Sequence, residues 1–476
     1  MKKTDSEDKP PSSPSHVTAI YISNILEGYY KSYNSLKSVE ERLFWTQYDT
    51  FDSNRALLYG NDNKIIITSS PIHRQHLDNM KVLMGWKNTH NIVPKNASHS
   101  ISEDCTKDIH LKNEIIRIIK KNPGISLIPY RLTPQFQKLI HFLREKKLNF
   151  DTPETIPEEK QFILNYFNTK RGFRHLWYLS QADNPPFVQI PEGFITQNKK
   201  EALDAAWWFK QQGQSFVMKY NSGTQGIGIE LINNRELPND KKRFDIHMKN
   251  VLKDKMWSEP MIIIEKAISP NEKAASISPS VEIYIDPKGN VSPSYVSDQI
   301  LALDKRTFRG IYIYPELMTD QSIVKTFAAG IKFGKKLAEY GYRGVFDIDL
   351  IRSTNNQIYA VEANLRRTGG THLHELSLAL LGGDYGKNYH TLIEDVFLHK
   401  NHNLTYDECC SLFKSDLYTH EKQSGIIFVN PDMLQVHILV IVLIGKTREQ
   451  MRTLRETVDR SLKSHIASET LAKRDW

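Results

Sequence analysis

The chain has 476 residues, of which 39% are hydrophobic and 25% are charged, and its formal net charge is +8. This composition is typical of a soluble globular protein and excludes a fibrous or wholly disordered chain, while the length predicts two or three domains. Three cysteines, two of them adjacent, exclude a disulfide framework and lack zinc-ligand spacing, so we expect a reducing, cytoplasmic location.

The first 150 residues predict a tail and an α/β unit. Residues 1–16 mix both signs of charge with proline and serine, and we interpret them as a disordered tail. In residues 17–150 a helical stretch over 19–45 precedes a short apolar strand over 64–70. A helix follows the Thr-Pro pair at 133–134.

Residues 151–400 predict two α+β lobes that face each other. Helices are expected over 157–181, 198–212 and 322–342, and strands over 215–220, 261–269, 280–286 and 291–300. Alternating strand patterns separated by polar turns indicate an antiparallel sheet.

The last segment, residues 401–476, predicts a small accessory domain. Its apolar run over 437–445 is far shorter than the roughly 20 residues of a membrane-spanning helix, and its β-branched residues favour a buried strand. No membrane span is expected. A helix capped by Thr447 should follow.

Residues 345–364 predict a β-hairpin with carboxylates on one face. Side chains on a strand point alternately to the two faces, and the polar loop at 353–356 keeps both sets aligned. We assign to the core face Phe346, Ile348, Leu350, Tyr359, Val361 and Ala363. The other face then carries Asp347, Asp349, Glu362 and Asn364.

Opposed carboxylates repel each other unless a cation lies between them. Two carboxylates and a carboxamide oxygen suit Mg²⁺, whereas the alternative is a polar hairpin face that simply meets water. The segment that follows favours the metal: Arg366 and Arg367 precede a Thr-Gly-Gly-Thr turn at 368–371 that leads into a helix. An arginine fork and free backbone N–H groups at a helix start bind anions, so the pattern is typical of phosphoryl transfer.

At this point the sequence resembles the ATP-grasp superfamily of carboxylate–amine ligases. The pair "DIDL" and "YAVEAN" is similar to the metal-binding hairpin of that family, which implies that Glu362 bridges two Mg²⁺ ions while Asp349 and Asn364 each bind one. Mn²⁺ is the substitute that such a site allows. The role of Asp347 is left open.

The resemblance also implies a nucleotide site. Lys170 and Lys219 would bind the α- and β-phosphates of ATP, and a glycine-rich loop from 222 to 228 would close over them. That loop contributes Ser222, Gly223, Thr224, Gln225 and Gly226. Glu265, with the backbone at Lys266 and Ala267, would meet adenine, and Glu282 is the candidate for ribose.

The substrates would be a small-molecule carboxylate and an amine, such as an amino acid or a peptide. Arg366 would stabilise the oxyanion, Arg367 or the turn of Gly369, Gly370 and Thr371 would orient the carboxylate, and Asp298 would contact the amine. Within the superfamily, "EANLRRTGGTH" is most similar to the pheganomycin-type peptide ligases. This implies a pre-ATP-grasp domain over 17–150, the ATP-grasp domain over 151–400 and an accessory domain over 401–476.

Three alternatives stay open. The amine or thiol of a carrier protein could be the acceptor, or the chain could be an inactive ATP-binding scaffold. A nucleic-acid binder would need a clustered basic and aromatic surface, which the sequence lacks. We expect a homo-oligomer without membrane partners.

Overall fold

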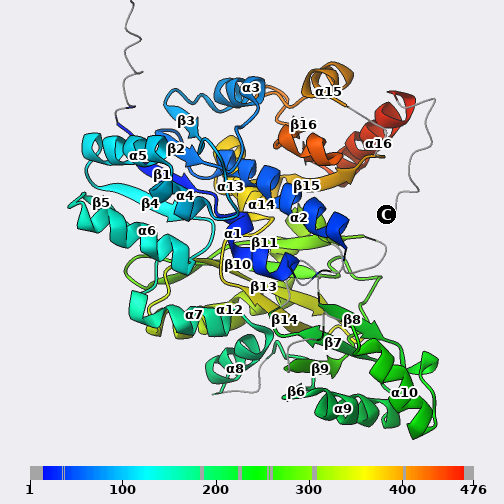
Figure 1. Cartoon of the computed structure of the whole chain (residues 1–476). Coiled ribbons are helices and arrows are strands. Elements are labelled where there is room, and N and C mark those ends of the chain that lie inside the picture. The colour runs from blue at the N-terminus through cyan, green and yellow to red at the C-terminus, as the bar shows by residue number, and fades with distance from the viewer. Residues whose placement is uncertain are drawn as a thin grey trace, which may run out of the picture.

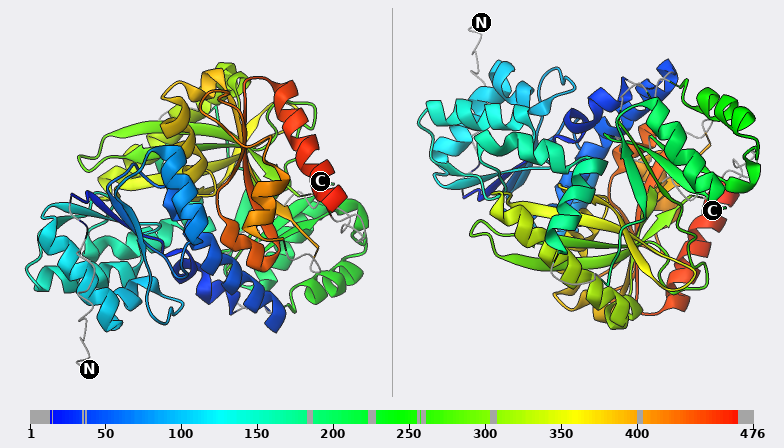
Figure 2. Two further views of the ribbon diagram at one scale, coloured as in Figure 1. Left: turned by 90° about the horizontal axis from the view of Figure 1, so that it is seen from above. Right: turned by 90° about the horizontal axis from the view of Figure 1, so that it is seen from below.

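The computed structural model describes residues 14, 16–34, 36, 38–182, 187–222, 228–254, 257, 261–302, 308–399 and 404–465. Three β-sheets, of five, four and eight strands, organise this part of the chain (Figure 1). The N-terminal unit (blue to cyan) and a small lobe (green) lie at opposite sides of both views of Figure 2.

The N-terminal unit is a parallel sheet in the order β3-β2-β1-β4-β5. Its strands are β1 (Ala19–Ile22), β2 (Lys64–Ile67), β3 (Thr89–Ile92), β4 (Ile125–Pro129) and β5 (Phe150–Asp151). Its helices are α1 (Ile25–Tyr33), α2 (Val39–Asp52), η1 (Ser53–Leu58), α3 (Arg74–Met84), α4 (Ile101–Lys107), α5 (Ile109–Lys121) and α6 (Pro134–Glu145). As predicted, Thr133 caps α6 by accepting a hydrogen bond from the backbone N–H of Phe136.

The helix predicted over 19–45 was wrong at its start, because residues 19–22 form the central strand β1. That strand pairs with β2 on one side and β4 on the other, and Ile20 and Ile22 are fully buried. A buried position between two parallel strands favours β-branched residues, and this tertiary setting overrides the local helical pattern.

The small lobe is an antiparallel sheet in the order β6-β9-β7-β8. It contains β6 (Gly193–Thr196), β7 (Phe216–Tyr220), β8 (Ile229–Ile232) and β9 (Ile262–Lys266), with α9 (Lys199–Gln211), η3 (Asn234–Glu236) and α10 (Lys241–Val251). The single helix predicted over 157–181 is instead η2 (Glu158–Lys160), α7 (Gln161–Phe167) and α8 (Lys170–Ser180). The break occurs because Thr169 is extended and its hydroxyl accepts a hydrogen bond from the N–H of Gly172.

The large sheet has the order β14-β13-β10-β11-β12-β15-β17-β16 and is antiparallel throughout. Its strands are β10 (Pro279–Ile285), β11 (Val291–Leu301), β12 (Phe308–Ile313), β13 (Gly344–Arg352), β14 (Ile358–Asn364), β15 (His390–Phe397), β16 (Gly425–Phe428) and β17 (Ile438–Gly445). The helices of this part are α11 (Pro315–Thr319), α12 (Gln321–Glu339), α13 (Thr371–Leu381), α14 (Tyr385–Asn388), α15 (Tyr406–Leu412), η5 (Pro431–Val436) and α16 (Arg448–His465).

The last two strands belong to this same sheet, since β17 pairs with β15 along its whole length. The segment predicted as an accessory domain, residues 401–476, therefore extends the large sheet. The predicted mixed α/β and α+β fold class is confirmed, while the exact domain boundaries stay a prediction.

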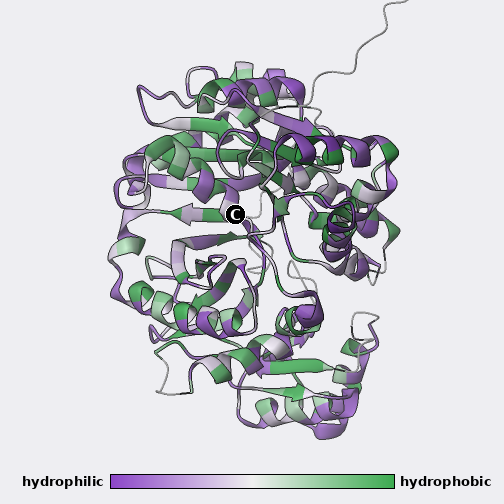
Figure 3. Cartoon of the chain, turned by 90° about the vertical axis from the view of Figure 1, so that its left-hand side faces the viewer, coloured by the Kyte–Doolittle hydropathy of each residue, from purple (hydrophilic) through white to green (hydrophobic). Residues whose placement is uncertain are grey.

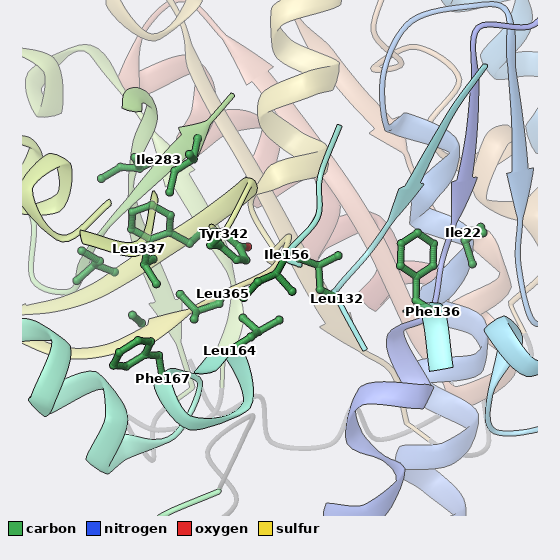
Figure 4. Close-up of a cluster of buried hydrophobic side chains, with 14 of the residues drawn as sticks. Ile22, Leu132, Phe136, Ile156, Leu164, Phe167, Ile283, Leu337, Tyr342 and Leu365 are labelled. Atoms are coloured by element: carbon green, nitrogen blue, oxygen red, sulfur yellow. The ribbon is translucent and has the colours of Figure 1, made fainter. Parts of the chain in front are cut away.

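One hydrophobic core continues from the N-terminal unit into the large sheet. In Figure 4 the buried side chains run from Ile22 and Phe136 through Leu132 and Ile156 to Leu337 and Ile283; all of them belong to one cluster. Figure 3 shows that the helices around this core carry both hydrophobic and hydrophilic residues. Among the helices that the structure describes, none is long and apolar enough to cross a membrane.

Candidate active site

A cleft of about 840 Å³ lies between the small lobe and the large sheet and continues beneath the N-terminal helices. Eleven of the predicted site residues line it: Lys219, Glu265, Lys266, Ala267, Asp298, Asp349, Glu362, Asn364, Arg366, Gly369 and Gly370. Lys170, Glu282, Arg367, Thr371 and Ser222 do not. Gly223, Thr224, Gln225 and Gly226 lie outside the described residues.

The predicted hairpin forms and aligns its carboxylates. Asp349 on β13 lies opposite Glu362 on β14, and Asp347 lies opposite Asn364. The predicted core face was wrong for Tyr359 and Val361, because a β-bulge follows the Asp349–Glu362 pair and shifts the register. Ile358 and Ala360 are buried instead, and Val361 lines the cleft.

The carboxylates are held by amides and repel one another. The side-chain N–H groups of Gln299 and Asn364 donate to the two oxygens of Asp349, at 2.6 and 3.0 Å. Burial raises the pKa of Asp349 well above its usual value, and the nearby Asp347 and Glu362 raise it further. A cation between these side chains would relieve both effects.

Asp347 adds a third carboxylate to the cleft. It is 5% exposed, and its Oδ2 accepts a hydrogen bond from Ser280 at 3.3 Å, but its Oδ1 has no partner among the described residues. Burial raises the pKa of Asp347, and the Arg366 guanidinium opposes this shift. A buried carboxylate oxygen without a donor is costly, so this atom calls for a ligand or a cation.

Hard oxygen donors of this kind fit Mg²⁺. They are not yet arranged as a metal cage: over the described ranges no group of three or more His, Cys, Asp or Glu side chains is placed to hold a metal ion. The reason is visible in the contacts, since Glu362 forms an ion pair with Lys170 and Asp349 is bound by the two amides.

Both predicted phosphate lysines are buried against carboxylates. Lys170 is the first residue of α8, and its ammonium group pairs with Glu362. Lys219, on β7, pairs with Glu265 and donates to the backbone carbonyl of Val361 at 3.2 Å. The bulge residue of the hairpin thereby fixes a lysine of the opposite lobe.

Glu265 is shared between two cations. Besides Lys219 it contacts Arg174, at 3.0 Å, and it is 4% exposed. The next two residues, Lys266 and Ala267, line the cleft beside it. The backbone N–H groups of these two residues donate to the carbonyls of Glu192 and Ser215, at 2.8 and 3.0 Å, so this end of β9 is held in place together with the carboxylate.

Arg366 faces the cleft. Its Nη2 donates to Asn364 at 2.8 Å, and its guanidinium carbon lies 5.5 and 5.9 Å from the ring centroids of Tyr29 and Tyr130. Within the described part of the chain it forms no ion pair. A cation with donors to spare, next to the acidic hairpin, is suited to bind an anionic group.

Arg367 points the other way, into the protein. It is 5% exposed, forms an ion pair with Glu154 and donates to the carbonyl of Pro129 at 3.0 Å. Sequence reasoning assigned it to catalysis, but these contacts connect the large sheet to the N-terminal unit.

The Thr-Gly-Gly-Thr turn packs tightly at the start of α13. A side chain at Gly370 would collide with the Tyr295 hydroxyl and with Ile311, so only glycine fits there. The Thr371 hydroxyl accepts a hydrogen bond from the N–H of Thr368 at 2.9 Å and donates one to Glu282. Glu282 thus lies beneath the turn, and burial raises its pKa to about 8.

Asp298 lines the cleft with its oxygens already engaged. They accept hydrogen bonds from the N–H of Ser278 at 2.8 Å and from the Ser276 hydroxyl at 3.1 Å. The Asp298 carboxylate orders the loop before β10, so fewer of its lone pairs are free to accept a hydrogen bond from an amine.

The structure adds cleft residues that no sequence motif indicated. Seven of them lie on the N-terminal helices, after β4 or on β15: Tyr29, Trp45, Tyr48, Asp52, Arg55, Tyr130 and Asp395. They converge only through tertiary packing, so no local pattern could have revealed them.

Comparison with solved structures supports this architecture. Biotin carboxylase from Campylobacter jejuni has a TM-score of 0.53 and 13% identity, covering 96% of this chain and 92% of that one. An N5-carboxyaminoimidazole ribonucleotide synthetase has a TM-score of 0.51 and 11% identity, with 96% and 99% covered. These enzymes share one fold. The chain has the ATP-grasp fold.

A third structure extends the comparison: the N5-carboxyaminoimidazole synthetase from Staphylococcus aureus, solved with ADP, has a TM-score of 0.50 and 11% identity over 94% of this chain and 98% of that one. No family model matches the sequence, and no curated protein matches it. At such low identity the ATP-grasp fold is what is shared.

Proposed function

We propose that this protein is an ATP-dependent carboxylate–amine ligase that forms an amide or peptide bond through an acyl-phosphate. One observation carries the proposal. Lys219, the acidic hairpin of Asp349 and Glu362, and Arg366 all line a single cleft of an ATP-grasp fold. Nucleotide phosphates, a divalent cation and a carboxylate substrate need these groups side by side.

The nucleotide would occupy the small-lobe end of the cleft. Adenine would meet the edge of β9 at Lys266 and Ala267, and Lys170 and Lys219 would bind the α- and β-phosphates. Their present partners, Glu362 and Glu265, support this role, because each ion pair orients its lysine before the phosphates arrive.

Asp349, Glu362 and Asn364 would hold Mg²⁺, with the free Oδ1 of Asp347 close to the same face of the sheet. When bound, the ions neutralise charge on the β- and γ-phosphates. Lys170 would then exchange Glu362 for phosphate, which releases that carboxylate for the metal.

In the first step a carboxylate oxygen of the substrate attacks the γ-phosphorus in line, and the bond to the β,γ-bridging oxygen breaks to release ADP. In the second step an amine attacks the acyl carbon, loses a proton and expels phosphate. Arg366 would stabilise the negative charge that develops on the carbonyl oxygen. Enclosure of the cleft protects the acyl-phosphate from water.

The finer assignment is to the pheganomycin-type peptide ligases, with an amino acid or peptide on each side of the new bond. It is supported by the segment from Glu362 to His372, in which Arg366 donates to Asn364 and the N–H of Thr368 closes the glycine turn by donating to the Thr371 hydroxyl. A carrier-protein acceptor and an inactive scaffold are the outcomes that the experiment separates from it.

The experiment is magnesium-dependent release of ADP from ATP, measured against panels of amino acids and dipeptides. We expect release only when a carboxylate and an amine are both present, and we expect Glu362→Gln and Lys219→Met to abolish it. Lys387→Met is the matched control, since that lysine is 70% exposed and distant from the cleft lining. Tight Mg·ATP binding without turnover on any panel would contradict a free amino acid or peptide substrate.

A further inference from the structure

The cleft does not end at Arg366. It continues under helix α2 to a region that we name the far chamber, lined by Trp45, Tyr48, Asp52, Arg55, Asp395 and Asn430. The ring of Tyr130 connects the two parts, because its centroid lies 5.9 Å from the guanidinium carbon of Arg366 and 5.3 Å from that of Arg55. A substrate bound at Arg366 can therefore extend into the far chamber.

Asp395 is the carboxylate of the far chamber that lacks a cationic partner. Asp52 pairs with Arg55 at 3.0 Å, whereas Asp395 accepts one hydrogen bond, 2.7 Å long, from the Tyr48 hydroxyl and forms no ion pair with any described residue. The nearest strand neighbour with a charge, Arg309, places its guanidinium carbon 3.5 Å from the centroid of the Phe397 ring instead. Asp395 therefore has no direct ion pair among these residues, although Arg55 and Arg309 both lie near enough to lower its pKa.

A second acceptor in the far chamber also lacks a donor. Asn430 is 1% exposed, and its NH₂ group donates to the carbonyl of Phe51 at 3.1 Å. Its carbonyl oxygen, Oδ1, has no hydrogen-bond partner in the part of the chain described. Both Asn430 and Asp395 contact α2, so the two unsatisfied acceptors converge on the same helix.

Aromatic rings complete the lining. Trp45 and Tyr48 lie with their centroids 5.4 Å apart and are partly exposed. Aromatic faces beside a carboxylate favour a desolvated cation over a neutral or anionic group. An ammonium group would supply donors to Asp395 and to Asn430 and would form the direct ion pair that Asp395 lacks within the described chain.

We propose that the far chamber binds a positively charged amine at the end of one organic substrate remote from the reacting group, so that this substrate is an amino acid or peptide with a basic side chain. The inference rests on the proposed ligase function and specifies its substrate class. Burial raises the pKa of Asp395 to about 7; the charge of Asp52 acts in the same direction, and the Tyr48 hydroxyl, Arg55 and Arg309 oppose it.

The test compares isosteric probes that differ only in charge. Lysine and alanyl-lysine, against norleucine and alanyl-norleucine, are titrated calorimetrically into the full chain loaded with magnesium and a non-hydrolysable ATP analogue. We expect at least one lysine probe to bind about ten-fold more tightly than its norleucine counterpart. Equal affinities in both pairs, or no saturable binding of either lysine probe up to about 10 mM, would overturn the proposal.

Substitutions locate the effect. Asp395→Asn keeps an acceptor for Tyr48 but removes the charge, and it should reduce the lysine affinity to that for norleucine. Asp384→Asn, at a carboxylate that is 71% exposed, should change nothing. Tyr48→Phe removes a donor to Asp395 and should retain or increase the preference for lysine. This variant replaces Asp395→Asn as the test if Asp395→Asn fails to fold. Loss of the preference in Tyr48→Phe would contradict our assignment.

The ligase and the far chamber can fail separately. Absence of binding of the magnesium–nucleotide complex alone would refute the proposed ligase. Intact nucleotide binding together with equal lysine and norleucine affinities would refute only the far chamber.

Discussion

Arg366 and Arg367 are neighbours in the sequence, but their guanidinium groups have different surroundings. Arg366 lies in the cleft next to Asn364 and carries no ion pair within the described residues, whereas Arg367 is buried against Glu154. A bend at residues 365–366, directly after β14, gives the two side chains different surroundings. A motif with two arginines therefore has one that lines the cleft and one that is buried in an ion pair.

Substitution of Arg367 should lower the free energy of unfolding, and not only the rate of ADP release. Arg367→Met leaves Glu154 as an uncompensated buried charge, so we expect the free energy of unfolding to fall by about 3 kcal/mol. Urea denaturation measures this change. Arg366→Met is the control and should leave the urea midpoint nearly unchanged while abolishing ADP release. Equal stability of the two variants would contradict the assignment.

Glu282 should make the stability of the fold depend on pH. Burial raises its pKa in the folded protein from 4.5 to about 8, so its contribution is fully present below about pH 4.5 and is lost as the pH rises through 8. Glu282→Gln cannot ionise, so the variant should not show this decrease in the free energy of unfolding. We expect the variant to gain a few kcal/mol relative to the wild type between pH 5 and pH 9, measured as the difference of their unfolding free energies.

The matched control for this prediction is Glu449→Gln, a substitution at a carboxylate that is 82% exposed. Its unfolding free energy should follow the wild type at both pH values. A Glu282→Gln variant whose difference from the wild type is the same at pH 5 and pH 9 would show that this carboxyl titrates normally in the folded state.

At the scale of elements, the alternation of polar and apolar residues predicted the β13–β14 hairpin and the alignment of Asp349 with Glu362. It could not predict the bulge, because one extra residue leaves the local pattern plausible and only the pairing with β13 shows which residue is displaced. Val361 moves from the expected core to the cleft for this reason. The sequence could not predict the far chamber either, because α2 and β15, which both line it, are separated by more than 300 residues.

The junction of α7 and α8 positions Lys170 and depends on Gly172. A Cβ at this glycine would lie 1.9 Å from the carbonyl oxygen of Tyr166, so Gly172→Ala must push the two helices apart. We expect a loss of about 1–3 kcal/mol in stability together with weaker Mg·ATP binding. Urea denaturation and nucleotide titration measure the two effects.

Gly383→Ala is the control for the helix junction, because no atom lies within 4 Å of its added Cβ. It should alter neither stability nor nucleotide binding. If Gly172→Ala bound Mg·ATP as tightly as the control, the junction would not determine where Lys170 lies.

At the scale of the whole molecule, the C-terminal segment completes the large sheet. β17 supplies the partner of β15 along its whole length, and its eight residues are all buried. A chain that ends at residue 400 would expose the edge of β15 and the apolar side chains beneath it. Such an edge is prone to aggregation.

We therefore expect the fragment of residues 1–400 to aggregate or to lack cooperative unfolding. The measurement is size-exclusion chromatography followed by thermal unfolding, with the full chain as the reference. A soluble fragment that unfolds cooperatively at the temperature of the full chain would establish residues 401–476 as a separable accessory domain, as the sequence predicted.

The central claim is that the cleft activates a carboxylate by phosphoryl transfer from ATP. It is tested most directly by supplying amino acids and dipeptides that are all labelled with oxygen-18 in their carboxylates, together with Mg²⁺ and ATP, and analysing the phosphate by mass spectrometry. The account predicts ADP and a phosphate that carries one labelled oxygen, because the acyl-phosphate breaks at its acyl carbon. Unlabelled phosphate, or AMP and pyrophosphate in its place, would contradict the account.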